Sequence, residues 1–495
     1  MTNGESAKTR VFVLVCTIIA SGMAFLDGTV VTVALPTLQS TFGATVSQIQ
    51  WIVDSYALTL AALLLTAGTL SDNFGHKRVF VVGIALFTLG SLLCGIALGA
   101  DSLIWARAFQ GIGAAFMIPG SLAIIYDTFP VDKRGKAIGV WAGFSGGIAA
   151  FGPFLGGWLT ETWNWRAIFF INLPLGAIAL YLTAIYVLPI LPKQRRPIDW
   201  LGTALITASL FLLAFALIEA PNFDIPHPAI WGPFVAGAIG LALFLWQEAR
   251  TPHPMLPLWL FRIREVAVAN SATFFVYFAL TCNIFLVVLN LQQVQGLSPI
   301  YAGLGLMPPI VIITFLSWVG GKLTDARGPR FPLLFGTLIV ATGILWIAFA
   351  RPNSSYWTDF FPGLTLFGLG MALVIAPVTK SALAVTEEWA GIASGVNNAV
   401  SRIAALFAIA ISGTTVALLF RRTLLPNLVS LPKDVQIDIL SQLNRLAAIE
   451  TTADVRPLIN EAFTAGYFWS LIGCAAAVLL AFFIVLIFLR KNSSR

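Results

Sequence analysis

Three ionisable residues lie inside otherwise apolar stretches of the sequence. Asp27 interrupts AFLDGTVVTVALP, Asp54 lies in WIVDSYAL, and Arg107 lies in LIWARAFQGIGAA. A charge in hydrocarbon is costly, so such residues face a bundle interior or a water-filled cavity and usually pair with one another. With a rise of about 1.5 Å per helical residue, all three are predicted to lie in the outer half of a bilayer.

The chemistry that such residues can perform is reversible proton binding. Burial raises the pKa of a carboxylic acid, whereas a nearby cation lowers it. An acid held between these influences, in a cavity open alternately to each side, can take up a proton on one side and release it on the other. We therefore interpret Asp27, Arg107 and Asp54 as a proton-coupling group. The alternatives are a permanent ion pair between Asp27 and Arg107, and simple hydration of Asp54 near a helix end.

Other polar residues within apolar runs are candidates for lining a cavity. Arg402 lies deep in GVNNAVSRIAAL, where it either lines the cavity or joins a hydrogen-bond network with Asn397 and Asn398. Four uncharged residues of two further runs form a second group: Tyr56, Tyr277, Asn283 and Asn290. Each of the four is expected either to face a cavity or to be satisfied by a neighbouring helix.

The composition is typical of a membrane protein. Of the 495 residues, 58% are hydrophobic and 10% are charged, and the mean hydropathy is +0.88; a soluble core could not hide so much apolar surface. A spanning helix needs roughly 20 apolar residues. The sequence predicts an all-helical transmembrane fold, since its runs are too long and uniform for barrel strands. Fourteen spans are predicted, near 11–36, 49–70, 79–99, 103–126, 137–158, 166–190, 200–220, 231–249, 266–290, 299–321, 331–350, 359–383, 392–420 and 464–489.

A short repeat divides the chain into two halves. GTLSDNFGHKR follows the second predicted span, and four of its residues recur 253 positions later, after the tenth span, in GKLTDARGPR: Gly68, Leu70, Asp72 and Gly75 match Gly321, Leu323, Asp325 and Gly328. In two six-helix halves the second copy would follow the eighth span, so two spans are expected to be inserted. We predict a six-helix bundle over 1–190, two inserted helices with flanking loops over 191–265, and a second six-helix bundle over 266–495.

Basic residues in the short loops predict the orientation. Most of the 29 Lys and Arg residues fall on one side, which the positive-inside rule makes the cytoplasmic side. The main groups are Lys77/Arg78, Lys133/Arg134/Lys136, Lys193/Arg195/Arg196, Arg262/Arg264 and Arg327/Arg330. Both termini are then cytoplasmic, in a plasma membrane or, in a bacterium, the inner membrane.

The long segment 421–463 is predicted to lie outside the membrane. Within it, apolar residues recur at roughly helical spacing and predict an amphipathic helix on the outer surface: Ile437, Leu440, Leu443 and Leu446. We interpret the segment as a passive lid or tether, with partner binding as the alternative.

Four motifs in order along the chain resemble the major facilitator superfamily. Residues 68–78 are similar to its loop signature, 103–115 to its fourth-helix signature, and AFGPFLGGWL (150–159) to its fifth-helix antiporter signature. LDGTVVTVALP is similar to the first-helix signature of the fourteen-span drug:proton antiporter branch. The resemblance covers essentially the whole chain and implies two six-helix bundles with two extra helices. Ile148 departs from the pattern, since relatives usually have Gly at this position, and Asp54 stands where relatives usually have a neutral residue.

The resemblance also implies roles for two of these motifs. In that family the loop latches one conformation, which assigns the following residues to gating: Gly68, Asp72, Gly75, Lys77, Arg78, Arg134, Asp325 and Gly328. Gly75 and Gly328 permit tight turns. For the charged members, the alternative is that they only set topology and cap helices. The antiporter motif comprises Gly152, Pro153, Gly156 and Gly157, although small residues also simply let helices pack closely.

Several other chemistries are not indicated. GFSGG (143–147) matches a hydrolase nucleophile pattern but lies in an apolar helical run, whereas that motif requires a strand-to-helix turn. The sequence has no P-loop for ATP, no metal-binding motif, no basic tract for nucleic acid, and four cysteines without metal spacing. We expect neither an enzyme nor a cofactor or metal.

Together these features predict a proton-coupled antiporter for multidrug efflux. It would export lipophilic, cationic small molecules by alternating access, with inward proton flow through Asp27 as the driving force. The expected partners are the small-molecule substrate, protons and the lipid bilayer, and further efflux components stay open. An uptake carrier or facilitator for a metabolite is one alternative on the same fold, and a receptor or scaffold that does not transport is the other.

Overall fold

The computed structural model describes residues 3–189, 197–223, 227–386 and 389–489, and within these ranges it contains helices and no β-strand. Fourteen of its helical segments are long and apolar enough to cross a membrane. The predicted all-helical fold and the predicted number of spans are therefore confirmed. The chain is a multi-pass membrane protein.

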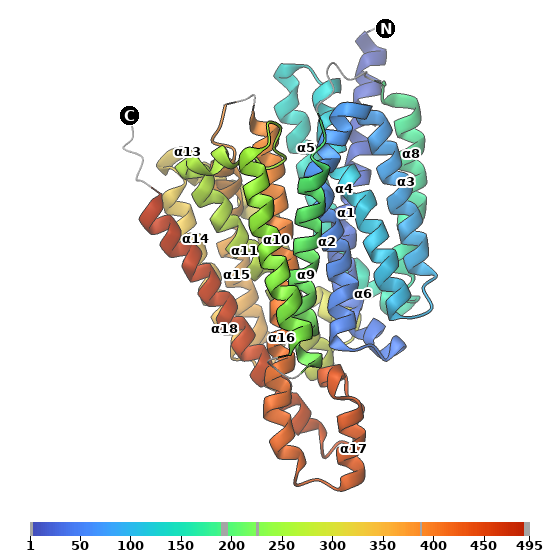
Figure 1. The fold of residues 1–495 in the computed structure, drawn as a ribbon, viewed down its shortest axis with the longest axis vertical. Coiled ribbons are helices and arrows are strands. Elements are labelled where there is room, and N and C mark those ends of the chain that lie inside the picture. Colours follow the sequence, from blue (N-terminus) through green and yellow to red (C-terminus); the bar gives the residue numbers. More distant parts are fainter. Residues whose placement is uncertain (1–2, 190–196, 224–226, 387–388, 490–495) are drawn as a thin grey trace. The chain divides into compact units, whose positions relative to one another are not determined.

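Figure 1 labels the helices in chain order, and those up to residue 250 come first. Their bounds are α1 (Asn3–Phe42), α2 (Val46–Phe74), α3 (His76–Gly95), α4 (Ala100–Thr128), α5 (Val131–Ala150), α6 (Gly152–Thr162), α7 (Ala167–Phe170), α8 (Asn172–Tyr186), α9 (Trp200–Glu219), η1 (Ala220–Asn222) and α10 (Pro228–Arg250).

The remaining elements follow residue 250 and begin with a short 3-10 helix, η2. Their bounds are η2 (Leu258–Arg262), α11 (Arg264–Leu289), η3 (Asn290–Val294), α12 (Pro299–Gly305), α13 (Met307–Arg327), α14 (Arg330–Ala348), η4 (Tyr356–Phe360), α15 (Phe361–Ala382), α16 (Ala390–Leu428), α17 (Lys433–Ser441), η6 (Leu443–Ala448) and α18 (Arg456–Phe488).

The chain forms two compact units. The first comprises Met1–Val31, Ile52–Leu212 and Ala236–Pro257, and the second comprises Thr32–Trp51, Leu213–Val235 and Leu258–Arg495. Helices α1, α2, α9 and α10 therefore contribute one part to each unit. The division at residues 190 and 265 stays a prediction, and its first boundary lies outside the described residues, as do Lys193, Arg195 and Arg196.

Glycines set the close packing of helix pairs within each unit. A Cβ atom at Gly90 on α3 would lie 2.7 Å from Cα of Gln110 on α4, and one at Gly343 on α14 would lie 2.5 Å from the backbone nitrogen of Phe367 on α15. Gly90 and Gly343 are separated by the same 253 residues as the loop repeat. Small residues at such contacts let two helix backbones approach closely. The two halves therefore share, besides the loop signature, a close contact between two helices at a glycine.

The fifth span is interrupted at Phe151, between α5 and α6. Pro153 lies in the first turn of α6, where its missing N–H is tolerated. At the departure from the family pattern, Ile148 packs against α1, and a Cβ at Gly22 would lie 2.7 Å from the Ile148 Cδ1 atom. The larger side chain on one helix is therefore accommodated by a glycine on the facing helix.

The segment 421–463 differs from the expectation. Helix α16 continues to Leu428, and the predicted amphipathic helix is the short α17, which lies at the same end of the molecule as the extended end of α16 (Figure 1). Ile437 and Leu440 are 69% and 47% exposed, while Ile439 is buried. The predicted apolar face was wrong because the helix ends at Ser441 and Leu446 takes a positive φ of 54°, which breaks the helical spacing.

Candidate functional site

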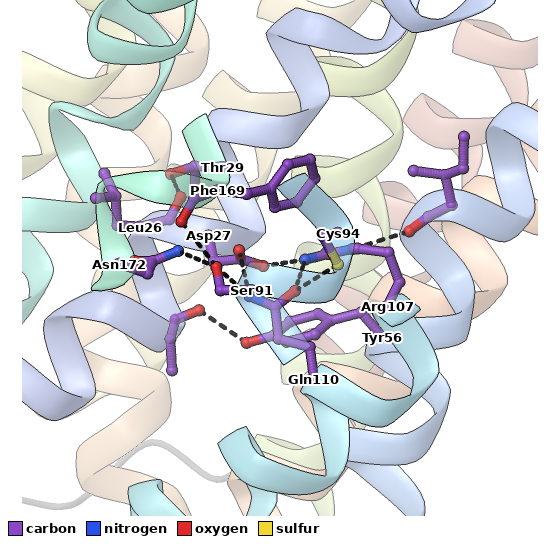
Figure 2. Close-up of polar contacts among 12 residues, drawn as sticks. Leu26, Asp27, Thr29, Tyr56, Ser91, Cys94, Arg107, Gln110, Phe169 and Asn172 are labelled. Atoms are coloured by element: carbon purple, nitrogen blue, oxygen red, sulfur yellow. Dashed lines mark hydrogen bonds and ion pairs between the residues drawn. The ribbon is translucent and has the colours of Figure 1, made fainter. Parts of the chain in front are cut away.

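Asp27 lies at the centre of a buried polar cluster in the first unit. Its side chain is fully buried, although it lies in the middle of α1. The Arg107 Nη1 atom on α4 donates to Asp27 Oδ2, and the Gln110 Nε2 atom donates to Asp27 Oδ1 at 2.9 Å (Figure 2). Both carboxylate oxygens therefore accept a hydrogen bond from α4.

Arg107 is the largest fully buried side chain of this cluster, with no exposed surface. Its Nε donates to the backbone oxygen of Ile52 on α2 at 3.1 Å, and Nη1 also donates to Gln110 Oε1 at 2.8 Å. The guanidinium carbon lies 4.3 Å from the centre of the Tyr56 ring, a cation–π distance. Nη2 has no hydrogen-bond partner among the described residues, so the cation keeps one unused buried donor.

A second layer of polar side chains holds Gln110 in place. Gln110 Nε2 also approaches Ser91 Oγ at 3.2 Å, and Asn172 Nδ2 donates to the same oxygen at 2.9 Å (Figure 2). Ser91 in turn donates to the backbone oxygen of Phe169 at 2.9 Å. The cluster thus joins α1, α2, α3, α4, α7 and α8 around one ion pair.

The sequence LIWARAFQG places these groups by its helical spacing. Arg107 and Gln110 are three residues apart and share one face of α4, and Gly111 follows at the contact with α2. A Cβ at Gly111 would lie 2.6 Å from the backbone oxygen of Tyr56. Tyr56 itself donates from its hydroxyl to the backbone oxygen of Ala24 at 2.9 Å. Gly111 thus lets α2 and α4 approach closely beside the ion pair.

Asp54 is the second acid of the first unit without solvent exposure. Neither of its carboxylate oxygens has a hydrogen-bond partner among the described residues. It lies two residues after Ile52, whose backbone oxygen accepts from Arg107. An isolated ionised carboxylate is so costly to bury that such groups are usually neutralised. The alternative considered for Asp54, a side chain hydrated near a helix end, does not agree with its burial in this conformation.

The loop signature after α2 is organised by a histidine. His76, the first residue of α3, contacts Asp72 Oδ1 through Nε2 at 3.3 Å and Asp127 Oδ2 of α4 through Nδ1 at 2.5 Å. A neutral imidazole has a single N–H, so both contacts are donated hydrogen bonds only when the ring is protonated. The gating residues assigned from the sequence do not include His76, because its contact with Asp127 joins residues 51 positions apart in the chain.

The basic residues assigned to this loop lie apart from Asp72. Lys77 donates to the backbone oxygen of Ala184 at 2.8 Å, and Arg134 donates from Nε to the backbone oxygen of Phe129 at 3.0 Å. Arg78 is exposed and forms no ion pair within the described part of the chain. Gly75 has a positive φ of 92°, as a tight turn requires. A Cβ at Gly68 would meet open space.

The second copy of the loop uses a different pairing. Asp325 forms an ion pair with Lys380 on α15, and both side chains are exposed. Gly328 ends α13 with a positive φ of 77°. The acid of the repeat thus contacts a basic side chain in both units, His76 in one and Lys380 in the other.

The antiporter motif packs against α1, next to Asp27. A Cβ at Gly152 would lie 1.9 Å from Thr29 Oγ1, and a Cβ at Gly156 would lie 2.5 Å from the backbone oxygen of Val30. Pro153 and Gly157 are buried in the same turns of α6. These glycines set the distance between α6 and the part of α1 that follows Asp27.

The candidates of the second unit lie on α11, η3 and α16. Asn397 donates to Asn270 Oδ1 at 3.2 Å and to Thr273 Oγ1 at 2.8 Å, so the amide of Asn397 joins α16 to α11. Tyr277 is half-buried and within electrostatic range of Arg402.

Two other amide side chains of this unit are buried. Among the described residues, Asn283 has no hydrogen-bond partner for its amide nitrogen or oxygen. Asn290 accepts from Gln295 at 3.1 Å, and its Nδ2 atom has no partner in the same part of the chain. Asn283 and Asn290 therefore keep unused hydrogen-bonding capacity inside the second unit.

Comparison with known families explains why these motifs occur together. The family model described as Major Facilitator Superfamily matches residues 17–409. The chain belongs to the major facilitator superfamily. The resemblance inferred from the four motifs is thereby confirmed, and with it the assignment to a family of membrane transporters.

Several relatives of this superfamily member are named for drug resistance. It is 36% identical over 439 residues to the multidrug resistance protein Stp of Mycobacterium tuberculosis, covering 88% of this chain and 81% of that protein. It is 32% identical to the tetracenomycin C resistance and export protein of Streptomyces glaucescens, covering 80% of this chain and 74% of that one.

Among solved structures, a bacterial homologue of the human lysosomal transporter Spinster matches with a TM-score of 0.69. The alignment covers 98% of this chain and 99% of that chain at 18% sequence identity. At this identity the similarity establishes the fold alone, and the fold is that of a transporter of the superfamily.

Proposed function

We propose that this protein is a proton-coupled antiporter that exports lipophilic, cationic small molecules. The observation that carries the proposal is the buried pair of Asp27 and Arg107, in which both carboxylate oxygens are hydrogen-bonded within one transmembrane bundle. The names of the relatives, a multidrug resistance protein and an antibiotic exporter, support the substrate class.

The contacts of Arg107 make protonation of Asp27 tolerable. Removing one partner of a buried ion pair leaves an uncompensated charge, which typically costs about 3–5 kcal/mol. When Asp27 gains a proton, however, Arg107 keeps the backbone oxygen of Ile52, the amide oxygen of Gln110 and the Tyr56 ring. The cation therefore stays solvated by the protein, and the free-energy difference between the two protonation states of Asp27 is reduced.

Proton exchange with water requires a different conformation, because Asp27 and Arg107 have no exposed surface here. In the proposed cycle, a conformation that opens toward one side exposes Asp27 and lets it gain or lose a proton. A bound cationic substrate and a proton compete, since the cavity accommodates one compensating positive charge better than two. Asp54 is proposed as a second proton carrier, because its carboxylate has no partner among the described residues.

The remaining site residues receive supporting roles in this proposal. The gating loops comprise Asp72 and Asp325 with Gly68, Gly75, Gly328, Lys77, Arg78 and Arg134. The glycines of 152–157 set the packing of α6 on α1. The substrate path is lined by Arg402 and by the polar residues of α11 and η3. The protein is proposed to lie in the plasma membrane. The basic residues of its short loops support an orientation in which both termini are cytoplasmic.

The test is efflux of a lipophilic cationic dye from proteoliposomes with an imposed proton gradient. Wild-type protein is expected to couple dye efflux to the gradient, and Asp27→Asn is expected to abolish coupling while it is inserted normally into the membrane. Asp101→Asn, which removes an exposed acid at the start of α4, serves as the matched control. Gradient-driven efflux by Asp27→Asn would contradict the proposal, and substrate accumulation in cells would favour an uptake carrier.

A further inference from the structure

A cavity of the first unit lies far along the helices from Asp27. It has a volume of about 190 Å³ and is enclosed by the start of α1, the start of α3, the end of α4 and the end of α8. Drug-sized ligands occupy pockets of about 300–1,000 Å³, so this cavity fits only a compact group. Its lining includes the basic residues Arg10, His76 and Lys77, and one acid, Asp127.

The acid is already engaged. Asp127 Oδ2 lies 2.5 Å from His76 Nδ1, and His76 also contacts Asp72. With the ring protonated, these three groups carry one net negative charge, which is smaller than the two positive charges of Arg10 and Lys77. Arg10 forms no hydrogen bond within the described part of the chain, and Lys77 uses one N–H for the backbone oxygen of Ala184. A guanidinium has five N–H donors and an ammonium three. The cavity therefore has an excess of donors and of positive charge.

Several side chains of the cavity wall are held by contacts within the protein. The Tyr186 ring, which lines it, stacks on Phe12 with ring centres 4.4 Å apart. Lys77 and His76 are held by the hydrogen bonds just described. Ile124, Val187 and Leu188 add an apolar side to the lining. Cationic donors beside apolar side chains match a group that is anionic at one end and apolar at the other.

We propose that this cavity binds the phosphate of an anionic phospholipid head group, through Arg10 and Lys77. Basic pockets between transmembrane helices at the cytoplasmic side are typical binding sites for anionic head groups, and Arg is well suited to bidentate phosphate contacts. The apolar side of the cavity receives the glycerol end of the lipid. The site is separate from the proposed substrate path and does not depend on which compound is exported.

The test measures lipid binding by the full-length protein. Native mass spectrometry counts the phosphatidylglycerol molecules retained after detergent exchange, and the melting temperature is compared in nanodiscs of phosphatidylcholine with and without phosphatidylglycerol. Arg10→Gln/Lys77→Gln is expected to bind phosphatidylglycerol at least roughly tenfold more weakly, because charge-assisted hydrogen bonds are lost. Arg10→Lys, which keeps the charge, is expected to retain most binding.

The matched control is Arg78→Gln/Lys136→Gln, which removes two exposed positive charges near the same loops without touching the cavity lining. Equal loss of binding in this control and in Arg10→Gln/Lys77→Gln would overturn the site. Equal retention of lipid by Arg10→Gln/Lys77→Gln and wild type would overturn it as well. If inorganic phosphate in detergent raised the melting temperature as much as phosphatidylglycerol does, the assignment to a lipid would be wrong.

Discussion

Asp127 and Lys380 occupy equivalent positions of the two repeats but carry opposite charges. They are separated by the same 253 residues that separate Asp72 from Asp325. Lys380 pairs directly with Asp325, whereas Asp127 and Asp72 would repel each other and are joined through His76. When it is protonated, the histidine thus supplies in the first unit the positive charge that a lysine supplies in the second.

This relationship predicts that the loss of His76 can be compensated by a lysine at position 127, which copies the pair of Asp325 and Lys380. His76→Gln removes the cation between two carboxylates, so we expect slower dye efflux and a lower melting temperature. Asp127→Lys in the His76→Gln background copies the Asp325–Lys380 pair and is expected to restore much of both. Initial efflux rates in proteoliposomes measure the effect. Normal efflux by His76→Gln, or no recovery in the double variant, would show that this pairing does not control transport.

A second prediction concerns Gln110, which donates to Asp27 and accepts from Arg107. Gln110→Leu removes the hydrogen bonds that Gln110 makes to Asp27 and to Arg107. A buried polar group left without a partner lowers the stability by about 1–3 kcal/mol. We expect a clearly lower melting temperature and slower proton-driven efflux. Gln247→Leu is the control, since Gln247 is half-buried near the end of α10. An equal change in both variants would mean that the amide has no special role at the ion pair.

Much of the fold and part of the candidate site could be predicted from the sequence. Fourteen apolar runs and a repeated loop signature are strong signals because each depends on many residues. Asp27 and Arg107 stood out because charges are rare inside apolar helices. Gln110, Ser91 and Asn172 did not, since neutral polar residues are common in such helices and only the three-dimensional packing places them together.

The errors and omissions have similar physical causes. The apolar spacing in 437–446 predicted a helical face, but the helix ends after nine residues, at Ser441, and a positive φ at Leu446 redirects the chain. His76 was missed because its significance depends on Asp127, which is distant in sequence and close in space. The compensation of Ile148 by Gly22 likewise depends on a contact between helices that a single sequence does not reveal.

The packing of the antiporter motif gives a third prediction, in which two glycine substitutions have opposite effects. Gly156→Ala would place a Cβ 2.5 Å from the backbone oxygen of Val30, and overpacking of this kind costs about 1–3 kcal/mol. Gly147→Ala meets nothing within 4 Å and is expected to stabilise α5 by up to about 1 kcal/mol, because Ala favours helix more than Gly. Thermal unfolding in detergent distinguishes the two, and equal shifts would contradict a packing role for Gly156.

The fourth prediction separates the roles of Asp27 and Asp54, two acids of the first unit that have no exposed surface. Asp54 has no ion-pair partner among the described residues, whereas Asp27 is bound by Arg107. Asp54→Asn removes no ion pair, so we expect a melting temperature at pH 7 that is unchanged or higher. If Asp54 carries a proton, the variant transports fewer protons per exported cation, while Asp27→Asn loses coupled transport altogether. Proton uptake and dye efflux measured together in proteoliposomes give this ratio, with Asp101→Asn as the control. A ratio equal to that of wild type would assign all coupling to Asp27, and a large loss of stability would mean that Asp54 is bound by a partner that this conformation does not contain.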